Sequence, residues 1–260
     1  MRQARPKGKP PWAWTLAASL LVPGVLVGRA DANPAPSCAA PLQVRPLATP
    51  GDDASGGSPD SAGPGDYRHN LRPTRLGWPT LSHWCVWIEP IGPSGPGLLW
   101  DQRWMAAVDG ALATWEQRLS ISRVSSPEQA QILIWRRKPP LRHNRASHGR
   151  AELQLQEVQR NGQWQIEPLV SVDISPGQAQ PAIQATALHE LGHAVGLWGH
   201  SDQSGDVMAV APGAKPLLQL SSRDQRTLEW LYRQPGLGAS ATRVAAPPAA
   251  GPARPAPDAN

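Results

Sequence analysis

Two histidines separated by three residues stand in a stretch of chain that is otherwise apolar on one side. His189 and His193 lie four positions apart, so on a helix they project from the same face, one turn apart. Two imidazoles in that arrangement can bind one metal ion. The opposite face of such a helix is apolar and carries Leu188, Leu191, Val195 and Trp198. The spacing therefore predicts a helix that is buried on one side and offers a pair of metal ligands on the other.

The residues around this pair predict a catalytic metal site. Glu190 follows the first histidine and is placed to accept a proton from a water molecule on the ion, whose pKa zinc lowers from about 15.7 to about 7. Gly196 permits the positive φ that ends a helix, so the chain can turn back and deliver His200 as a third ligand. Three protein ligands leave one position for water, whereas a structural zinc site is usually closed by four side chains, often cysteines.

Other interpretations of these residues stay open at this point. A bare His-Glu-x-x-His pattern occurs by chance, and a structural zinc ion would use the same histidines. Asp202 is an alternative third ligand in place of His200. Trp198 lies between the second and third ligands, where it either walls the metal site or packs the helix.

With Gly196 and His200 the stretch resembles the signature of the metzincin metallopeptidases, and within them of the matrixin-like branch. That signature is His-Glu-x-x-His-x-x-Gly-x-x-His, followed by a turn that holds a methionine under the metal. The resemblance covers about residues 84–233 and implies that the three histidines bind one catalytic Zn²⁺ ion, with Glu190 as the general base. It also implies that Met208 is the methionine of the turn.

The chain between residues 84 and 233 predicts an α+β fold that can hold these residues. Apolar runs bounded by turn residues predict strands at 84–88, 132–135, 151–155 and 169–174. Apolar residues at helical spacing predict further helices at about 101–119 and 222–233, the second opening with Ser222 and Gln225 at capping-box spacing. The order is metzincin-like, and implies a twisted mixed sheet with a packing helix, an active-site helix and a C-terminal helix.

Two departures from the family pattern concern the third ligand and the turn. Three residues separate Gly196 from His200 where the usual signature has two. Because that ligand arrives from an irregular turn, one added residue can be absorbed. Met208 is followed by Ala209 and not by the tyrosine that often stands there in relatives, which implies a smaller, apolar floor to the substrate pocket.

Matrixins also bind structural zinc and calcium through a loop rich in histidine and aspartate. The corresponding region here, about 136–150, holds His143 and His148 but no carboxylate, so a structural Ca²⁺ or second Zn²⁺ ion is doubtful. Its basic residues are Arg136, Arg137, Lys138, Arg142, Arg145 and Arg150. They either favour acidic substrates or an anionic surface, or form a solvated hairpin.

The ends of the chain differ in composition from its middle, since the 30 Pro and 24 Gly cluster there. Residues 1–32 join a basic start to an apolar run and an Ala-x-Ala end, as in a signal peptide or signal anchor. Residues 33–83 form a Pro/Gly-rich flexible linker or propeptide-like segment, and 234–260 a disordered Pro/Ala-rich tail. The zinc metallopeptidase domain is then 84–233. Residues 1–32 carry +4 of the net charge of +5, so no nucleic-acid partner is expected.

Only two cysteines are present, Cys38 and Cys85. An exported chain meets an oxidising compartment, where a single disulfide between them would tie the amino-terminal segment to the first strand. The alternatives are two unpaired thiols, or a Cys38 thiolate that caps the metal of an inactive precursor.

These observations lead to one expected function and one alternative. We expect a secreted or envelope-anchored zinc endopeptidase that acts on proteins or peptides as a monomer, in the periplasm or outside the cell. Its amino-terminal segment offers a means of association with a membrane. The alternative is a non-catalytic metzincin-like envelope protein used for binding. The sequence does not predict which peptides are cleaved.

Overall fold

The computed structural model describes residues 38–47, 65–141, 147–211 and 213–237. Its strands are β1 (Gln43–Pro46), β2 (Trp84–Ile88), β3 (Ile121–Arg123), β4 (Ile132–Trp135), β5 (Gly149–Arg160) and β6 (Gln163–Ile174). Its helices are α1 (Leu98–Glu116), α2 (Gln180–Ala194) and α3 (Ser222–Leu231), with short 3-10 helices η1 (Arg68–Asn70) and η2 (Pro127–Gln129). The mixed sheet and three α-helices among the described residues confirm the α+β class.

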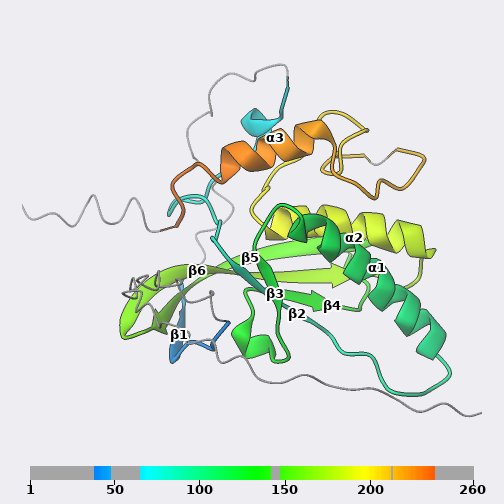
Figure 1. Ribbon diagram of the computed structural model, residues 1–260, viewed down its shortest axis with the longest axis horizontal. Coiled ribbons are helices and arrows are strands. Elements are labelled where there is room, and N and C mark those ends of the chain that lie inside the picture. The colour runs from blue at the N-terminus through cyan, green and yellow to red at the C-terminus, as the bar shows by residue number, and fades with distance from the viewer. Residues whose placement is uncertain (1–37, 48–64, 142–146, 212, 238–260) are drawn as a thin grey trace, which may run out of the picture. The chain divides into compact units, whose positions relative to one another are not determined.

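The strands form one sheet in the order β1-β5-β6-β4-β2-β3 (Figure 1). The pairs β6–β4, β4–β2 and β2–β3 are parallel, whereas β5 is antiparallel to both β6 and β1. β5 and β6 are each 12 residues long and are joined by Asn161 and Gly162. These two residues have φ angles of 50° and 77°, as a tight hairpin turn requires. Both strands are therefore about twice as long as their apolar cores predict.

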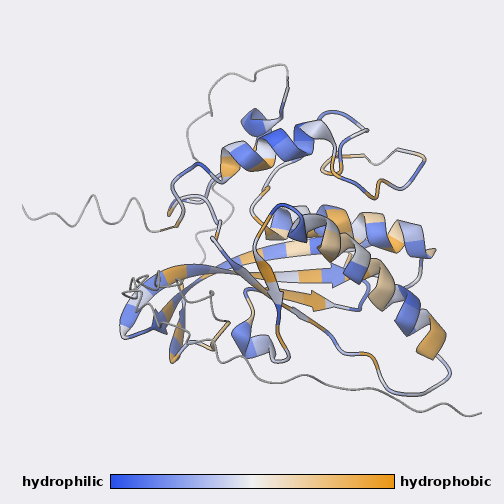
Figure 2. Ribbon diagram, viewed as in Figure 1, coloured by the Kyte–Doolittle hydropathy of each residue, from blue (hydrophilic) through white to orange (hydrophobic). Residues whose placement is uncertain are grey.

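Helices α1 and α2 pack against each other on one face of the sheet, and α3 lies beyond α2 (Figure 1). Apolar residues concentrate on the strands and on the inner sides of α1 and α2 (Figure 2). Trp104 and Trp115 of α1 are fully buried, and their indole N–H groups donate to the carbonyls of Ile174 and Leu188 at 3.1 and 3.0 Å. These bonds attach α1 to β6 and to the helix that carries the histidine pair.

Helix α3 begins as expected at Ser222, but its cap is one residue earlier than the sequence analysis predicts. The Ser221 hydroxyl accepts from the backbone N–H groups of Arg223 and Asp224, and the Asp224 carboxylate accepts from the Ser221 N–H at 2.9 Å. The capping box is thus Ser221 and Asp224, not Ser222 and Gln225. An aspartate fills the position that glutamate or glutamine usually takes.

Residues 65–83 extend the folded domain toward the amino terminus, beyond the boundary at 84 that the composition predicts. Tyr67 and Leu71 are fully buried in the main core, and Trp78 packs edge-on against Trp230 of α3 with ring centroids 5.5 Å apart. The Tyr67 hydroxyl donates to Asp224 at 2.7 Å. A segment that lacks apolar periodicity therefore packs through a few large side chains.

The expected signal segment, residues 1–32, lies outside the described residues. Within the part of the chain that the structure describes, no helix has the length and apolar character needed to cross a membrane.

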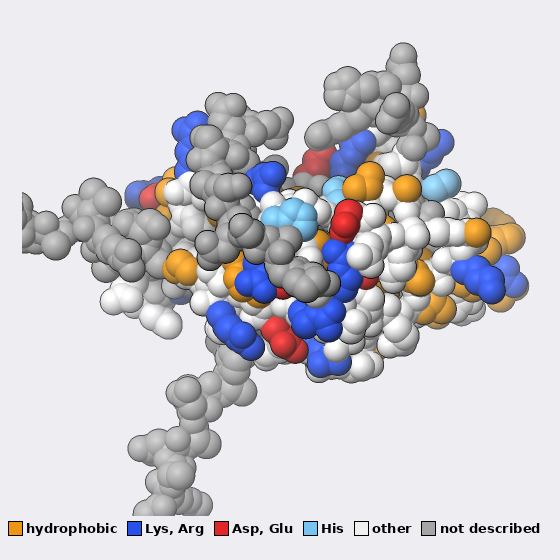
Figure 3. Space-filling view, turned by 90° about the horizontal axis from the view of Figure 1, so that it is seen from above, with side chains coloured by type: hydrophobic (Ala, Val, Ile, Leu, Met, Phe, Trp, Pro, Cys, Tyr) orange, Lys and Arg blue, Asp and Glu red, His pale blue; other side chains and the backbone are white. Residues whose placement is uncertain are grey.

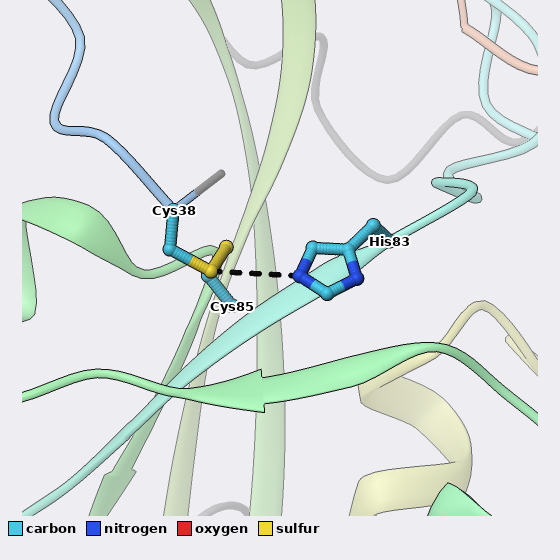
Figure 4. A group of neighbouring side chains, drawn as sticks. All are labelled: Cys38, His83 and Cys85. Carbon is cyan, nitrogen blue, oxygen red and sulfur yellow. Dashed lines mark hydrogen bonds between the residues drawn. A yellow bond between two sulfur atoms is a disulfide. The ribbon is translucent and has the colours of Figure 1, made fainter. Parts of the chain in front are cut away.

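Strand β1 is held at the edge of the sheet by a covalent bond. Cys38 and Cys85 form a disulfide, the first of the three alternatives above (Figure 4). Nε2 of His83 lies 3.6 Å from the Cys38 sulfur, and its Nδ1 lies 2.8 Å from the Ser120 hydroxyl. The bridge joins the segment before β1 to the interior strand β2.

Loss of the disulfide is expected to destabilise the domain, because the bridge closes a loop with a sequence separation of 47. The Cys38→Ser/Cys85→Ser variant should lose about 2–4 kcal/mol of unfolding free energy, most of it as chain entropy gained by the unfolded state. Urea unfolding followed by tryptophan fluorescence measures the change. Wild-type protein with dithiothreitol should unfold at the same urea concentration as the variant; equal midpoints for the variant and the oxidised wild type would contradict this prediction.

Candidate metal centre

Helix α2 ends where the metal site begins, and the way it ends directs the chain back over the site. Gly196 has a φ of 111°, a conformation that favours glycine. Its N–H donates to the carbonyl of His193 and the N–H of Leu197 donates to the carbonyl of Gly192, at 2.9 and 3.0 Å. This pair of bonds is the Schellman arrangement, which reverses the chain after a helix. The turn predicted from Gly196 therefore forms.

The turn brings the third histidine to the other two. One ligand nitrogen from each of His189, His193 and His200 lies within 4.8 Å of the others. Nitrogens bound at about 2.1 Å to one tetrahedral ion lie about 3.4 Å apart, so small rotations of the rings would bring all three onto it. The three histidines thus converge as the sequence predicts, although two come from a helix and one from a loop.

Backbone carbonyls fix the orientation of the two helical rings. Nδ1 of His189 lies 2.7 Å from the carbonyl oxygen of Val207, and Nδ1 of His193 lies 2.8 Å from that of Leu197. A carbonyl accepts only, so each Nδ1 carries the proton and each Nε2 keeps its lone pair for a metal. Burial lowers the pKa of all three histidines, that of His193 to about 3. Three neutral imidazoles are a donor set that suits zinc.

Glu190 lies beside the histidines but is not one of the converging ligands. Burial raises the pKa of its carboxyl group to about 7, while a backbone hydrogen bond at Ala151 and the charge of Arg150 act in the opposite direction. Gly149 makes room for this side chain, because a Cβ at that position would lie 2.6 Å from Cγ of Glu190. A carboxyl group with a pKa near neutrality can both accept and release a proton, as a general base must.

Met208 lies beneath the histidine helix, where the family pattern implies a methionine. It is fully buried, and a Cβ on Gly192 would come within 2.2 Å of its sulfur. The turn and the helix therefore approach each other through a glycine. Trp115 of α1 closes the same contact from the other side.

Two buried aspartates that the sequence analysis did not single out hold the turn in place. Asp224 accepts from the backbone N–H of Val207 at 2.9 Å and from Tyr67. Asp206 accepts from the hydroxyls of Ser201 and Ser221 and from the guanidinium of Arg223, at 2.5, 2.6 and 2.7 Å. In the sequence, Asp224 is marked only by its position two residues after Ser222, where the last helix is predicted to begin.

The loop that carries His200 is held by Asn70, the last residue of η1, and by Arg72. The side-chain amide of Asn70 donates to the carbonyl of His200, and the N–H of Arg72 donates to that of Trp198, both at 2.9 Å. A Cβ on Gly199 would lie 2.2 Å from the carbonyl oxygen of Asn70. No hydrogen bond to the His200 ring itself is found among the described residues. The loop is therefore held through its backbone, while the His200 ring stacks on that of His189 with centroids 5.3 Å apart.

The structure also places the residues whose roles were left open. Asp202 is exposed and forms an ion pair with Arg223 at 2.8 Å, and its carboxylate does not belong to the group formed by the three histidines. Trp198 stacks on His193 with ring centroids 5.5 Å apart and an angle of 20° between the rings, and it also packs against the hydrophobic core, so it combines the two roles that were left open. Its indole nitrogen is buried and has no hydrogen-bond partner among the residues that the structure describes.

The basic region 136–150 is more neutral than its composition suggests. Arg136 pairs with Asp101, Arg137 pairs with Asp173 at 2.7 Å, and Arg150 donates to the carbonyl of Pro140. Arg142, His143 and Arg145 lie outside the described residues.

Besides the three histidines, the one described group with ligand types close enough for a metal is Cys38, His83 and Cys85, whose sulfurs form the disulfide. Figure 3 shows histidine side chains on the upper face of the molecule with Lys and Arg side chains nearby.

Comparison with known proteins gives one match. A sequence profile of the matrixin family matches residues 99–233, which include the three histidines, Glu190 and Met208. Among curated proteins, none matches the chain. The matched region begins after η1, so the segment that holds the His200 loop lies outside it.

Removal of the third histidine should abolish stable metal binding. We expect His200→Ala to weaken zinc binding by at least about 100-fold, since two imidazoles cannot complete the site. Asp202→Ala, two positions away, is the matched control and should bind one zinc ion per chain like the wild type. Isothermal titration of the metal-free proteins with zinc gives both values. Normal binding by His200→Ala together with loss in Asp202→Ala would assign the third ligand to the aspartate.

The hydrogen bond from Asn70 to the carbonyl of His200 should strengthen zinc binding, although Asn70 is not itself a ligand. Asn70→Ala removes the donor to the His200 carbonyl, and we expect the zinc dissociation constant to rise about tenfold, a typical effect of a lost supporting contact. Thermal unfolding of the metal-free variant provides the control for general damage. Unchanged zinc affinity in Asn70→Ala would show that the loop holds His200 by itself.

Proposed function

The chain belongs to the matrixin family of metallopeptidases, and from this premise we propose that it is a secreted or envelope-anchored zinc endopeptidase with Glu190 as its general base. The observation that carries the proposal is the convergence of three neutral imidazoles next to a buried carboxyl group. The other described group of ligand types, Cys38, His83 and Cys85, has both of its sulfurs in the disulfide.

We assign His189, His193 and His200 as the residues that would hold the zinc ion. When bound there, zinc would polarise the scissile carbonyl and lower the pKa of a water molecule toward neutrality. The fit rests on the donor set, because the two helical rings are neutral and their Nδ1 atoms are already engaged. Met208 would support the site from below through its contact with Gly192.

Glu190 is the residue of this chain that would take part directly in the proton transfers. Its carboxylate accepts a proton from the attacking water and later gives that proton to the leaving amine, which is why a pKa near 7 suits it. The backbone at Ala151 and the lack of a side chain at Gly149 hold the carboxyl group in place, so it need not reorganise during the reaction.

We expect the peptide to bind in an extended conformation along the outer edge of β5, the strand that passes beside Glu190. An open sheet edge offers backbone donors and acceptors to any peptide, whatever its side chains. Val210, which follows the turn and is highly exposed, would line an apolar part of the substrate pocket. The absence of a tyrosine after Met208 fits a shallow pocket there.

The proposed location rests on the amino-terminal segment and on the cysteines. Residues 1–32 have the composition of a signal peptide or signal anchor. The disulfide between Cys38 and Cys85 is of the kind that persists in an oxidising compartment, outside the cytoplasm.

Substitution of the base should separate metal binding from catalysis. Glu190→Gln keeps the size of the side chain but cannot accept the proton, so we expect zinc binding to be retained and peptide cleavage to fall about 10²- to 10⁴-fold. Glu116→Gln, on the exposed side of α1, is the matched control and should cleave like the wild type. Cleavage of a broad peptide library, read by mass spectrometry, measures activity. If the zinc-loaded wild type cleaves nothing in the library, the chain is a binding protein with a matrixin fold.

A further inference from the structure

The disulfide between Cys38 and Cys85 has a histidine beside it that the proposed function does not use (Figure 4). Nε2 of His83 points at the Cys38 sulfur and lies 3.6 Å from it. One donor atom from each of these three residues lies within 4.8 Å of the others, as in the group of three histidines. Two sulfurs and an imidazole are donors that suit zinc. We call these residues the Cys-His-Cys cluster.

The spacing within the Cys-His-Cys cluster matches what a zinc ion needs. In a tetrahedral site, a zinc–sulfur bond of about 2.3 Å and a zinc–nitrogen bond of about 2.1 Å place the two donor atoms about 3.6 Å apart. The distance from Nε2 of His83 to the Cys38 sulfur already has this value. The two sulfurs are bonded to each other and would have to separate. A zinc ion and the disulfide therefore exclude each other.

The imidazole of His83 is held in the orientation that a ligand requires. Its Nδ1 lies 2.8 Å from the Ser120 hydroxyl, which can accept a hydrogen bond from an Nδ1–H group. That tautomer leaves the lone pair of Nε2 for a metal. The carbonyl of Ser120 also accepts from the N–H of Trp84, the residue after His83, at 2.9 Å. Ser120 thus fixes both the ring and the backbone beside it.

Hydrogen bonds hold the backbone on both sides of the disulfide. The N–H of Cys85 donates to the side-chain carbonyl of Gln131 at 3.0 Å, and its C=O accepts from the Gln131 N–H at 2.9 Å. On the other side, the guanidinium of Arg160 donates to the carbonyl of Ala39, the residue after Cys38, and β1 pairs with β5. We therefore expect the two cysteines to stay near each other when the bond between their sulfurs is reduced.

We propose that the reduced Cys-His-Cys cluster is a zinc site, so that this part of the chain holds either a disulfide or a metal ion. A dithiol reductant gives two electrons and two protons to the disulfide and is itself oxidised to a disulfide. Zinc then binds both sulfurs as thiolates and the imidazole as a neutral ligand, and the two thiol protons pass to solvent. With a disulfide as oxidant, the reverse reaction forms the S–S bond again and releases the ion.

The two states would attach the same segments to each other. Either the S–S bond or the ion joins the segment before β1 to β2. A chain that is still reduced would thus have this attachment before it meets an oxidising compartment. The site lies apart from the histidines of α2 in composition and in sequence, and the proposal does not depend on peptidase activity.

The zinc stoichiometry of the full chain in two redox states tests the site. Reduction uses a trialkylphosphine, which takes an oxygen atom from water while the two sulfurs take the hydrogens, and which competes for zinc less than a dithiol does. Isothermal titration with zinc should show one more ion per chain in the reduced form than in the oxidised form. Because the readout is this difference, it holds whether or not the three histidines bind an ion.

A matched pair of histidine variants locates the additional ion. In reduced His83→Ala its dissociation constant should rise by at least about 100-fold, since a ligand is lost. His148→Ala removes an exposed histidine outside the cluster and should bind the ion like the wild type. Ser120→Ala should weaken binding about tenfold, as expected for a positioning residue. The oxidised forms of all three variants should bind zinc like the oxidised wild type.

Cobalt shows whether sulfur is a ligand. Cobalt bound by thiolates absorbs strongly in the near ultraviolet, and a site of three imidazoles lacks this band. We expect the band in the reduced wild type, and its absence in the oxidised wild type and in Cys38→Ser/Cys85→Ser.

Three outcomes would overturn the proposal and leave the proposed function untouched. The first is equal zinc stoichiometry in the oxidised and reduced chain. The second is a cobalt-loaded reduced chain without the thiolate band, whatever the variants do. The third is an additional ion that His83→Ala binds as tightly as the wild type, because the two thiols would then bind it without the imidazole.

Discussion

The hydrogen bond between His189 and the carbonyl of Val207 joins the histidine helix to the turn under the metal site, and much of the structure serves to keep it. A carbonyl that accepts from Nδ1 leaves Nε2 as the free nitrogen, so the bond sets both the direction and the protonation of the ring. The backbone of Val207 is itself anchored, because its N–H donates to Asp224 at 2.9 Å. Asp224 is fixed by the start of α3 and by Tyr67, which lies 157 positions earlier in the chain.

Burial shifts the pKa values of the groups in the site, and it also requires a hydrogen-bond partner for each polar atom. It lowers the pKa of the histidines, which favours their neutral form, and raises that of Glu190 to about 7. The same burial demands a partner for each polar atom. The aspartates of the turn meet this demand because hydroxyls, backbone N–H groups and Arg223 surround them. His200 is the exception, since its ring makes no hydrogen bond among the described residues and its loop is held through the backbone.

The parts of the fold that the sequence predicts are those encoded by local patterns. Helix α2 and its end follow from the spacing of His189 and His193 and from Gly196, and the positions of α1, α3, β2 and β4 follow from apolar periodicity. β5 and β6 were predicted too short, because their outer halves are polar and the Asn161-Gly162 turn was not used as a signal. β1 and the packing of Tyr67 and Asn70 were missed, because they depend on contacts with residues more than a hundred positions away. The cap of α3 was placed one residue late, since adjacent serines offer two registers.

The bond between Tyr67 and Asp224 has a consequence for the order of events during synthesis. Almost the whole domain must emerge before the two residues can meet, and closing so long a loop is slow compared with helix formation. Helix α2 can form earlier, but without α3 the turn that orients its first histidine has no anchor. In an unfinished chain the first histidine is thus not yet oriented to bind a metal. Protease activity would arise only after the last helix has packed against the domain.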